Sequence, residues 1–433
     1  MRMGFDARGF LLPAGLPGCG STARTAGRPA ALEAGTASGV GVVEVVDRPA
    51  FLRLEKDWNA LVESTSDAPF YRHEYIRSWM DSFVPGARIK VFTGRDHGGK
   101  LVAALPLVAE RGFLYGLPVR WLVSPTSTHT ARFDLIAADR RSAARAFVRT
   151  LADDHTWDVI RITDVPAGGN AWDLYHAAAR AGFPAGAWES HHSPFIPLPA
   201  TYAALEARLS SRFKANLRRR RRRLEERGPV TVERVTGGAA LEAGLEECFA
   251  LERSGWKGRR GTAAALSSKT LGFYTGLAHR ASRGDYFSLF FLKVAGRAIA
   301  AQYGLTRGGV YALMMTCYDE TFREYSPGHL LMEDVLRDCI AGGLNEFDFL
   351  GCDMGWKQDW SPIVRAHHWF FIFRDNAMGR MLRKAKFDWI PAAKGGLARW
   401  RRSGAGVQAA AVRIFDRSNR RRPDMRAASA VAP

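Results

Sequence analysis

The sequence predicts a mixed α/β (α+β) fold built from two similar units, each a twisted and mostly antiparallel sheet flanked by helices. Strand-like and helix-like patterns alternate along the chain, which favours this class. Three apolar runs in the second half are separated by short turns containing glycine, which is typical of a meander. The order of hairpin, helix and strand occurs twice, and the segment 99–104 (GKLVAA) resembles 296–301 (GRAIAA). We therefore expect two copies of one α/β unit.

The first unit is expected over residues 40–200. It follows an N-terminal extension, residues 1–39, which is rich in glycine and alanine, has no sustained periodicity and is predicted to be disordered. Within the unit, apolar periods of two and of 3.6 residues separate strands from helices. The patterns predict, in order, a strand over 42–46, helices over 50–64 and 69–83, strands over 89–93, 101–109 and 133–137, a helix over 142–153, a strand over 158–163, a helix over 171–181 and a strand near 194–199.

The second unit is expected over residues 201–375, followed by a basic and partly helical tail over residues 376–433. It opens with a long predicted helix over 205–227, because four apolar residues recur on one helical face and Gly228 ends the pattern. The four are Leu209, Phe213, Leu217 and Leu224, and the later patterns predict a strand over 230–235, a helix ending near 251, a helix over 266–282, strands over 286–294, 298–305 and 310–317, a helix over 327–341, and strands over 346–350 and 367–374.

The net charge of +19 is concentrated in two stretches. Residues 208–227 carry ten basic side chains against two glutamates, and residues 380–433 carry fourteen against three aspartates, so the rest of the chain is neutral. Both stretches are therefore candidates for contact with an anionic membrane surface or another polyanion. Specific binding of nucleic acid is not expected, because no aromatic residues interleave the arginine run over 218–223.

Composition excludes several classes of protein. The hydrophobic share of 47% and the charged share of 24% are ordinary for a globular chain and exclude a wholly disordered or collagen-like one. The five cysteines form no C-x-x-C pair, so neither a zinc site of that type nor a disulfide framework is predicted, and we expect no metal site. No apolar run reaches the roughly 18 residues that span a bilayer. Because the N-terminus lacks a signal pattern, we expect a cytoplasmic protein, peripheral at the inner membrane if its basic stretches bind there.

The loop that opens the helix over 327–341 is the most informative motif. Ser326 suits the N-cap and Pro327 the first helical position. The first turn contains no Asp or Glu, and the first acidic residue is Glu333. A helix start with free backbone N–H groups and no acidic side chain predicts a pyrophosphate-binding site. A plain capped helix is the alternative.

The pattern Arg323-x-x-Ser326-x-Gly328 resembles the Q/R-x-x-G-x-G/A acyl-CoA loop of the GNAT acyltransferase superfamily, with Ser326 in place of the first glycine. The span of about 42–375 is similar to the BioF2-like, cellulose-biosynthesis (CelD-type) acetyltransferase family, a tandem-GNAT group related to Fem-type transferases. The matching segments are 213–219 (FKANLRR), 251–258 (LERSGWKG), 318–320 (YDE), 326–328 (SPG) and 347–351 (FDFLG).

This resemblance implies an acyltransferase that uses acetyl-CoA or another acyl-CoA as co-substrate and holds no permanently bound cofactor. The acceptor would be an amine or hydroxyl of a sugar-derived or cell-envelope (exopolysaccharide) molecule. Two alternatives remain open. One is an aminoacyl-tRNA-dependent transferase of the Fem type, and the other is a non-catalytic scaffold peripheral to the membrane. The expected donor-binding residues are Arg323, Ser326, Gly328 and His329.

Strand 346–350 supplies the expected catalytic carboxylates. Its period of two places Glu346 and Asp348 on one face, opposite Phe347 and Phe349. Two carboxylates on a strand that ought to be buried are costly unless they have a role. We expect Asp348 to be the general base and Glu346 to adjust its acidity. The alternative is that one of them forms a cap or a salt bridge.

Further candidates flank these motifs. Tyr318 and Asp319 end the central strand beside the expected thioester, Tyr318 as a catalytic residue and Asp319 as a substrate-binding one. Trp256 and Lys257 are expected to line the acceptor side, with Lys257 binding an anionic group. His329 is expected to contact phosphate or relay a proton. The alternatives are an Asx turn at Asp319, a solvated Lys257 and a structural His329.

Overall fold

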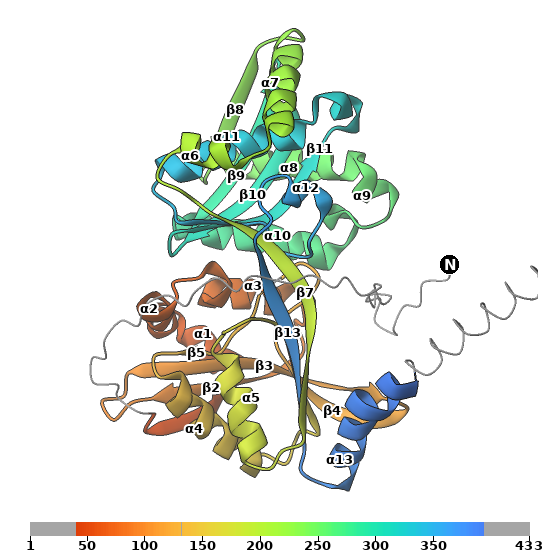
Figure 1. Ribbon diagram of the computed structural model, residues 1–433. Helices are drawn as coiled ribbons and strands as arrows, with labels where there is room; N and C mark the ends of the chain where they lie inside the picture. Colours follow the sequence, from red (N-terminus) through yellow and green to blue (C-terminus); the bar gives the residue numbers. More distant parts are fainter. Residues whose placement is uncertain (1–39, 131, 394–433) are drawn as a thin grey trace, which may run out of the picture. The chain divides into compact units, whose positions relative to one another are not determined.

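The computed structural model describes residues 40–130 and 132–393, which form a mixed sheet of 13 strands flanked by helices (Figure 1). This confirms the predicted fold class. The extension predicted over 1–39 and most of the predicted basic tail, residues 394–433, lie outside the described residues. No helix in the described part of the chain is long and apolar enough to cross a membrane.

The strands follow the order β1-β2-β3-β4-β6-β13-β7-β12-β11-β10-β9-β8, with β5 paired to β3. The pairings are antiparallel except for β4 with β6 and β11 with β12. The strands are β1 Val42–Val46, β2 Arg88–Arg95, β3 Leu101–Leu114, β4 Leu117–Val123, β5 Ile136–Ala137, β6 Val159–Pro166, β7 Ala185–Pro197, β8 Val230–Val235, β9 Phe287–Val294, β10 Arg297–Arg307, β11 Val310–Tyr318, β12 Glu346–Asp348 and β13 Val364–Phe373.

The helices bury their apolar stripes on the sheet in three clusters of core residues. Short helices η1 Pro69–Tyr71, η2 Ala264–Leu266, η3 Glu320–Tyr325 and the π-turn η4 Ala385–Trp389 connect or extend longer elements. The α-helices are α1 Arg48–Arg53, α2 Glu55–Thr65, α3 His73–Phe83, α4 Arg140–Asp153, α5 Ala171–Arg180, α6 Tyr202–Arg208, α7 Ser211–Glu225, α8 Ala240–Ser254, α9 Trp256–Arg259, α10 Ser268–Arg283, α11 Pro327–Ala341, α12 Gly355–Gln358 and α13 Ala377–Lys384.

The prediction of one long helix over 205–227 is wrong, because the chain forms two helices there. α6 ends at Arg208, and α7 begins after Ser210, whose hydroxyl accepts a hydrogen bond from the Phe213 amide at 3.2 Å. A serine in this position competes with a continuous helix by capping a new one. The apolar stripe is nevertheless largely buried, since Leu217 and Leu224 lie in the core under α7.

Two long strands join the halves of the sheet. β13 belongs to the second predicted unit in sequence but lies between β6 and β7 of the first, and β7 pairs with β12 of the second. In Figure 1 these two strands run side by side through the middle of the ribbon. The sequence also missed β4, whose second residue is Pro118, and placed the start of β7 nine residues too late. The partners of β7 are distant in sequence, whereas β4 forms a hairpin with β3 and its proline obscured the strand pattern.

Candidate functional site

β11 has an open edge next to β12. The two parallel strands are paired only where Val310–Ala312 faces Glu346–Asp348, although β11 continues to Tyr318. Past Asp348 the chain turns away, through left-handed backbone at Leu350 (φ 53°) and Gly351 (φ 58°). The two strands therefore diverge and leave a gap along the second half of β11.

Side chains cover part of this edge. The Tyr274 hydroxyl donates to the Met314 carbonyl at 3.3 Å, and Lys257 Nζ donates to the Thr316 carbonyl at 3.2 Å. His129, from the segment between β4 and β5, lies with Nδ1 3.4 Å from the Tyr274 hydroxyl oxygen. The first half of the chain thus reaches the open edge of a strand in the second half.

The start of α11 follows directly from β11 and η3. Ser326 occupies the N-cap position in a left-handed conformation (φ 48°, ψ 57°), and its side chain accepts no hydrogen bond from the helix within the described residues. The predicted position of Ser326 is confirmed, but a side-chain cap is absent there. The first turn contains no acidic side chain, and the amides of His329 and Leu330 donate to the Ser326 carbonyl at 2.9 and 3.2 Å.

Tyr318 lies close to Gly328 at the start of α11. A methyl group added at Gly328 would lie 3.8 Å from Tyr318 Cδ1, which is an ordinary van der Waals contact. The protein itself therefore does not require glycine at this position. Arg323 is exposed in the last turn of η3, on the approach to the same turn.

His329 is packed among aromatic rings. Trp360 Nε1 donates to His329 Nδ1 at 3.1 Å, which assigns the ring proton to Nε2. The Phe213 ring of α7 lies 5.4 Å from the imidazole, centroid to centroid. Burial lowers the pKa of His329; the Asp359 charge opposes this shift and Arg220 adds to it, and because the net shift is downward the imidazole is neutral at pH 7.

Asp319 forms the Asx turn that the sequence left open. Its carboxylate accepts from the Thr321 amide at 2.9 Å and the Thr321 hydroxyl at 2.7 Å, and it also pairs with Arg297. Burial alone would raise the pKa of Asp319, but the hydrogen bonds from Thr321 and the Arg297 charge outweigh it and lower the pKa. The carboxylate is therefore already engaged in capping η3.

Lys257 forms an internal ion pair. Its Nζ lies 2.9 Å from Glu252 Oε1, and Glu252 is only 3% exposed. The second oxygen of Glu252 accepts from the Ala264 amide at 2.8 Å. Lys257 thus neutralises a buried carboxylate at the open edge of β11. Trp256 begins α9, and its side chain lies outside the described part of the chain.

Glu346 and Asp348 share one face of β12, as the alternation predicted. Phe347 points to the other face, where its ring stacks on Tyr311 at 4.9 Å. Arg365 of β13 bridges the two carboxylates, with Nη2 2.8 Å from Glu346 Oε2 and Nη1 3.3 Å from Asp348 Oδ2. Arg132 also donates to Asp348 Oδ2. Two carboxylates and two guanidinium groups therefore form one charge-balanced cluster around Asp348, which is 1% exposed.

Two neutral imidazoles lie beside this cluster. His191 of β7 and His367 of β13 are opposite each other in the ladder, and their rings stack at 4.8 Å with 3° between planes. Burial lowers the pKa of His367 to about 2 and that of His191 to about 4, and the nearby Arg132 and Lys357 charges add to the shifts. The Nε2 atoms of both rings and the Ser193 hydroxyl have no hydrogen-bond partner among the described residues.

Lys357 closes the far side of the same region. It lies in α12 with 5% of its surface exposed, and its Nζ donates to the carbonyls of Leu350 and Cys352. Burial lowers the pKa of Lys357 to about 8, although Cys352 and Asp348 oppose the shift. Its ammonium group therefore holds the chain where it turns away from β11.

The structure brings the predicted site residues together in two groups. Tyr318 lies with Ser326, Gly328 and His329 at the start of α11, and Glu346 lies with Asp348. Asp348 pairs in register with Ala312, six residues before Tyr318, so the two groups are roughly 20 Å apart along β11. Tyr318 and Asp348 consequently cannot both contact one reacting carbon atom.

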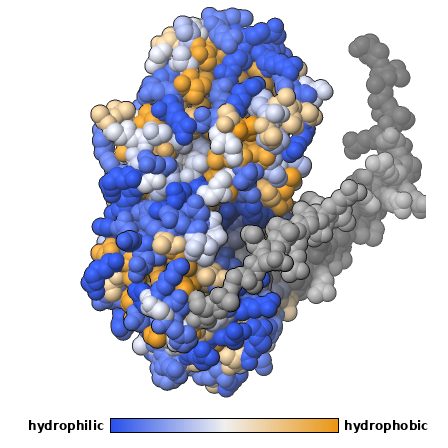
Figure 2. Space-filling model, turned by 90° about the vertical axis from the view of Figure 1, so that its left-hand side faces the viewer, coloured by the Kyte–Doolittle hydropathy of each residue, from blue (hydrophilic) through white to orange (hydrophobic). Residues whose placement is uncertain are grey.

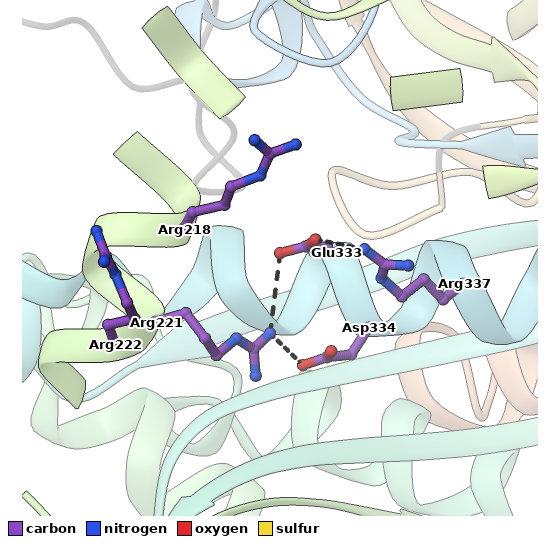
Figure 3. Close-up of a pocket in the computed structure, with 6 residues that line it drawn as sticks. All are labelled: Arg218, Arg221, Arg222, Glu333, Asp334 and Arg337. Carbon is purple, nitrogen blue, oxygen red and sulfur yellow. Dashed lines mark hydrogen bonds and ion pairs between the residues drawn. The ribbon is translucent and has the colours of Figure 1, made fainter. Parts of the chain in front are cut away.

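A pocket of about 620 Å³ lies between α7 and α11 (Figure 3). Arg221 Nη2 lies 2.7 Å from Asp334 Oδ2 and 3.1 Å from the Leu330 carbonyl, and Arg337 pairs with Glu333 at 2.9 Å. Asp334 of α11 thus offsets part of the repulsion within the arginine-rich helix, whereas the Arg337–Glu333 pair lies within α11 itself. The residues that line the pocket are Arg218, Arg221, Arg222, Glu333, Asp334 and Arg337.

Sequence reasoning missed the side chains that surround Asp348 and the open edge of β11. They come from five separate segments and meet only through long-range packing. The sequence signals only two of these side chains, which lie in the polar stretch over 124–132 between two apolar strands. The missed residues are His129, Arg132, His191, Tyr274, Lys357, Arg365 and His367.

The segment that carries most of this geometry matches a known family model. Residues 211–358 match the acetyltransferase (GNAT) domain. The match covers α7 to α12, and therefore the open edge of β11, the start of α11 and the carboxylates of β12. No curated protein sequence matches the chain.

Solved structures resemble a larger part of the chain. FemX has 11% identical residues and a TM-score of 0.53, over 76% of this chain and 98% of that one, which shows a shared fold. The C-terminal domain of a putative lysylphosphatidylglycerol synthetase from Agrobacterium fabrum is 11% identical, with a TM-score of 0.48 over 76% and 94% of the two chains. A tandem GNAT protein from the clavulanic acid biosynthesis pathway is 15% identical, with a TM-score of 0.40 over 76% and 98%.

Proposed function

We propose that this chain transfers an acyl group from acyl-CoA to an amine or hydroxyl of a sugar-derived or cell-envelope (exopolysaccharide) acceptor. One observation supports this most strongly: the open edge of β11 leads directly into the acid-free start of α11, within the segment that matches a GNAT domain. A strand edge and a helix start in series can hold the two ends of one long thioester.

The donor's diphosphate is proposed to lie at the start of α11, against the Gly328 amide, with Arg323 and His329 beside it. Its pantetheine arm would then pass Tyr318 and follow β11 toward Met314. Amide and carbonyl of one residue point the same way in a regular antiparallel ladder, so the Thr316 amide faces the open edge together with its carbonyl. Met314 is the extra residue of a β-bulge opposite Tyr303 and Gly304. The Thr316 amide would bond the thioester carbonyl, while Ser326 sets the turn.

Asp348 is proposed as the general base at the other end of this path, with Glu346 and the two arginines fixing its orientation. The acceptor's nitrogen or oxygen attacks the thioester carbon, its proton passes to Asp348, and the carbon–sulfur bond breaks to release the thiolate. Because of the separation along β11, Tyr318 is proposed to contact the donor arm rather than the reacting carbon. The hydroxyl group of Tyr274 lies on the open edge near Met314.

The polar groups beside Asp348 support an acceptor rich in hydroxyl groups. Neutral imidazole nitrogens on His191 and His367 and the Ser193 hydroxyl can each exchange a hydrogen bond with a sugar hydroxyl. Lys257, Asp319 and Trp256 are proposed to border the acceptor path, with Lys257 and Asp319 acting through their internal ion pairs.

Titration of donors against the full-length chain tests the proposal. Acetyl-CoA at 100 times its Kd should raise the free energy of unfolding by about 2.7 kcal/mol and therefore raise the melting temperature. Coenzyme A should do the same, because the diphosphate is shared. Stabilisation by aminoacyl-tRNA without any by acetyl-CoA would instead support a Fem-type donor. If neither ligand binds, the chain is not a transferase of this kind.

A further inference from the structure

The described part of the chain exposes a group of large apolar side chains at one place. Phe113 and Tyr115, at the tip of the β3–β4 hairpin, are 75% and 49% exposed. Met381 of α13 and Trp389 at the end of η4 are 41% and 56% exposed. We call these residues, with the basic side chains around them, the hairpin–α13 face.

The two parts of this face are adjacent. Lys386 Nζ of η4 lies 5.9 Å above the Tyr115 ring and 4.5 Å above the Trp188 ring. Figure 1 likewise shows α13 beside β4. Phe387 packs against Trp188 at 5.4 Å, and Leu382 is buried. The folded part of α13 and η4 is thus held on the sheet while Met381 and Trp389 point away from it.

The same face carries an excess of positive charge. α13 and η4 contribute Arg380, Arg383, Lys384 and Lys386, against Asp388 alone on the same two elements. Lys384 is exposed, and Arg111 lies near the tip of the hairpin. The sequence that follows, residues 394–433, adds ten basic residues against two aspartates. An anionic partner is therefore favoured wherever this face makes contact.

Both basic stretches contain ion pairs, and on α13 Arg380 pairs with Asp375 and Arg383 with Asp388. On α7, Arg218 pairs with Glu206, Arg221 with Asp334 and Arg223 with Glu324, each at 2.7 Å. None of the exposed large apolar side chains in the described ranges lies on α7. On the side of the molecule shown in Figure 2, hydrophobic residues form small groups separated by hydrophilic ones. Basic and exposed aromatic side chains thus occur together at the hairpin–α13 face and not at α7.

We propose that the hairpin–α13 face docks on an anionic phospholipid surface. Phe113, Met381 and Trp389 would enter the boundary between head groups and acyl chains, while the lysines and arginines contact lipid phosphates. Each basic group near such a surface contributes favourably, and apolar burial adds to it. The face lies on the first half of the chain and on α13, outside the matched segment 211–358, so docking does not depend on the proposed acyl transfer.

Co-sedimentation of the full-length chain with vesicles tests this docking. The chain should bind vesicles of phosphatidylcholine and phosphatidylglycerol mixed about 3:1, should bind pure phosphatidylcholine at least about tenfold more weakly, and should dissociate as salt rises. The double variant F113S/W389S should lower binding to the mixed vesicles by about tenfold or more, because each residue loses the apolar burial. A single variant, K384E, should lower it severalfold.

Matched controls distinguish this face from the rest of the surface. V232S changes an apolar residue that is also exposed, and R219Q/R222Q removes exposed charges from α7. Both should bind the mixed vesicles within about twofold of the unchanged chain. Because all these positions are exposed, melting temperature and acetyl-CoA binding should stay unchanged in every variant, which separates loss of docking from loss of fold or of donor binding.

Three results would overturn the proposal. Equal binding of F113S/W389S and the unchanged chain would exclude the apolar contact. Loss of binding in R219Q/R222Q alone would place the lipid contact on α7. If the chain ignores vesicles and F113S/W389S instead changes its oligomeric state in gel filtration, the face is a contact between copies of the chain.

Discussion

At the scale of single residues, backbone geometry decides how the start of α11 is built. The Q/R-x-x-G-x-G/A pattern has glycine where this chain has Ser326, and Ser326 is held in the left-handed region (φ 48°), which glycine adopts without cost. A serine there is strained by about 1–2 kcal/mol, which explains why the pattern prefers glycine. Ser326 in place of the motif's glycine therefore keeps the left-handed turn before α11.

Gly328→Asp is expected to weaken acyl-CoA binding by about tenfold or more, because a carboxylate at the start of α11 repels the donor's diphosphate. It should not destabilise the chain, since an acidic side chain in the first turn complements the helix dipole. Gly328→Ala is the matched control and should keep its affinity, because the Q/R-x-x-G-x-G/A pattern accepts alanine there and the added methyl group lies at an ordinary 3.8 Å from Tyr318. Calorimetric titration of acetyl-CoA measures affinity, and thermal unfolding measures stability. Unchanged affinity in Gly328→Asp would remove the diphosphate from this turn.

Asp348→Asn is expected to lower turnover by on the order of 10²-fold, from loss of a general base. It should also cost stability, because Arg132 and Arg365 lose a buried carboxylate partner; breaking such a pair costs about 3–5 kcal/mol. Activity must therefore be compared per folded molecule. Arg132→Gln is the matched control, since it breaks the same pair and leaves the carboxylate in place. Equal loss of turnover in both variants would make Asp348 a positioning residue.

At the scale of elements, the strands β12, β7 and β13 carry polar side chains in the middle of the sheet. Glu346 and Asp348 on β12, His191 on β7, and Arg365 and His367 on β13 all face the same region. Period two in the sequence was enough to predict the face of the carboxylates. It could not predict the arginines and imidazoles on the same face, because the residue pattern of one strand does not specify which strand pairs with it.

His191→Asn is expected to make the chain less sensitive to acid. The pKa of His191 is lowered to about 4 by burial, below its ordinary value near 6.5, so the unfolded chain binds a proton that the folded chain does not. Stability is unaffected above pH 6.5 and falls as the pH drops from 6.5 toward 4, by on the order of 1–3 kcal/mol. Asn removes this loss.

Urea unfolding of both proteins between pH 7 and pH 4 measures the effect. Asp134 and Asp164, whose pKa values burial raises to about 6, act in the opposite direction over this window. They are present in both proteins, so the difference between the two stability curves isolates His191. His97→Asn, on the exposed turn between β2 and β3, should leave the curve unchanged. A parallel pair of curves for His191→Asn would contradict the prediction.

At the scale of the whole molecule, the two predicted units share one continuous sheet, and the folded part extends past them into α13. β13 of one unit completes the sheet of the other, and Leu382 and Phe387 then pack on that sheet. The described beginning of the basic C-terminal stretch is therefore part of the fold.

Two truncations are expected to behave differently. Deleting residues 380–433 should lower the melting temperature by several degrees, because it removes the buried Leu382 and the Phe387 ring that packs on Trp188. Deleting residues 394–433 alone should leave the melting temperature nearly unchanged and reduce salt-sensitive association with polyanions. Differential scanning fluorimetry and heparin-column elution measure the two effects. A large drop in melting temperature for the shorter deletion would show that residues 394–433 pack on the fold.

The sequence by itself determined most of the elements and the position of Ser326 at the start of α11. Strands such as Val42–Val46 and Val230–Val235, helix Pro327–Ala341 and the alternating face of Glu346 and Asp348 follow from interactions between residues a few positions apart. Only the tertiary structure decided that β13 inserts between β6 and β7, and that Arg132 meets Asp348 across 216 residues. Such contacts arise when separate apolar surfaces are buried together, and no local pattern encodes the partner that burial selects.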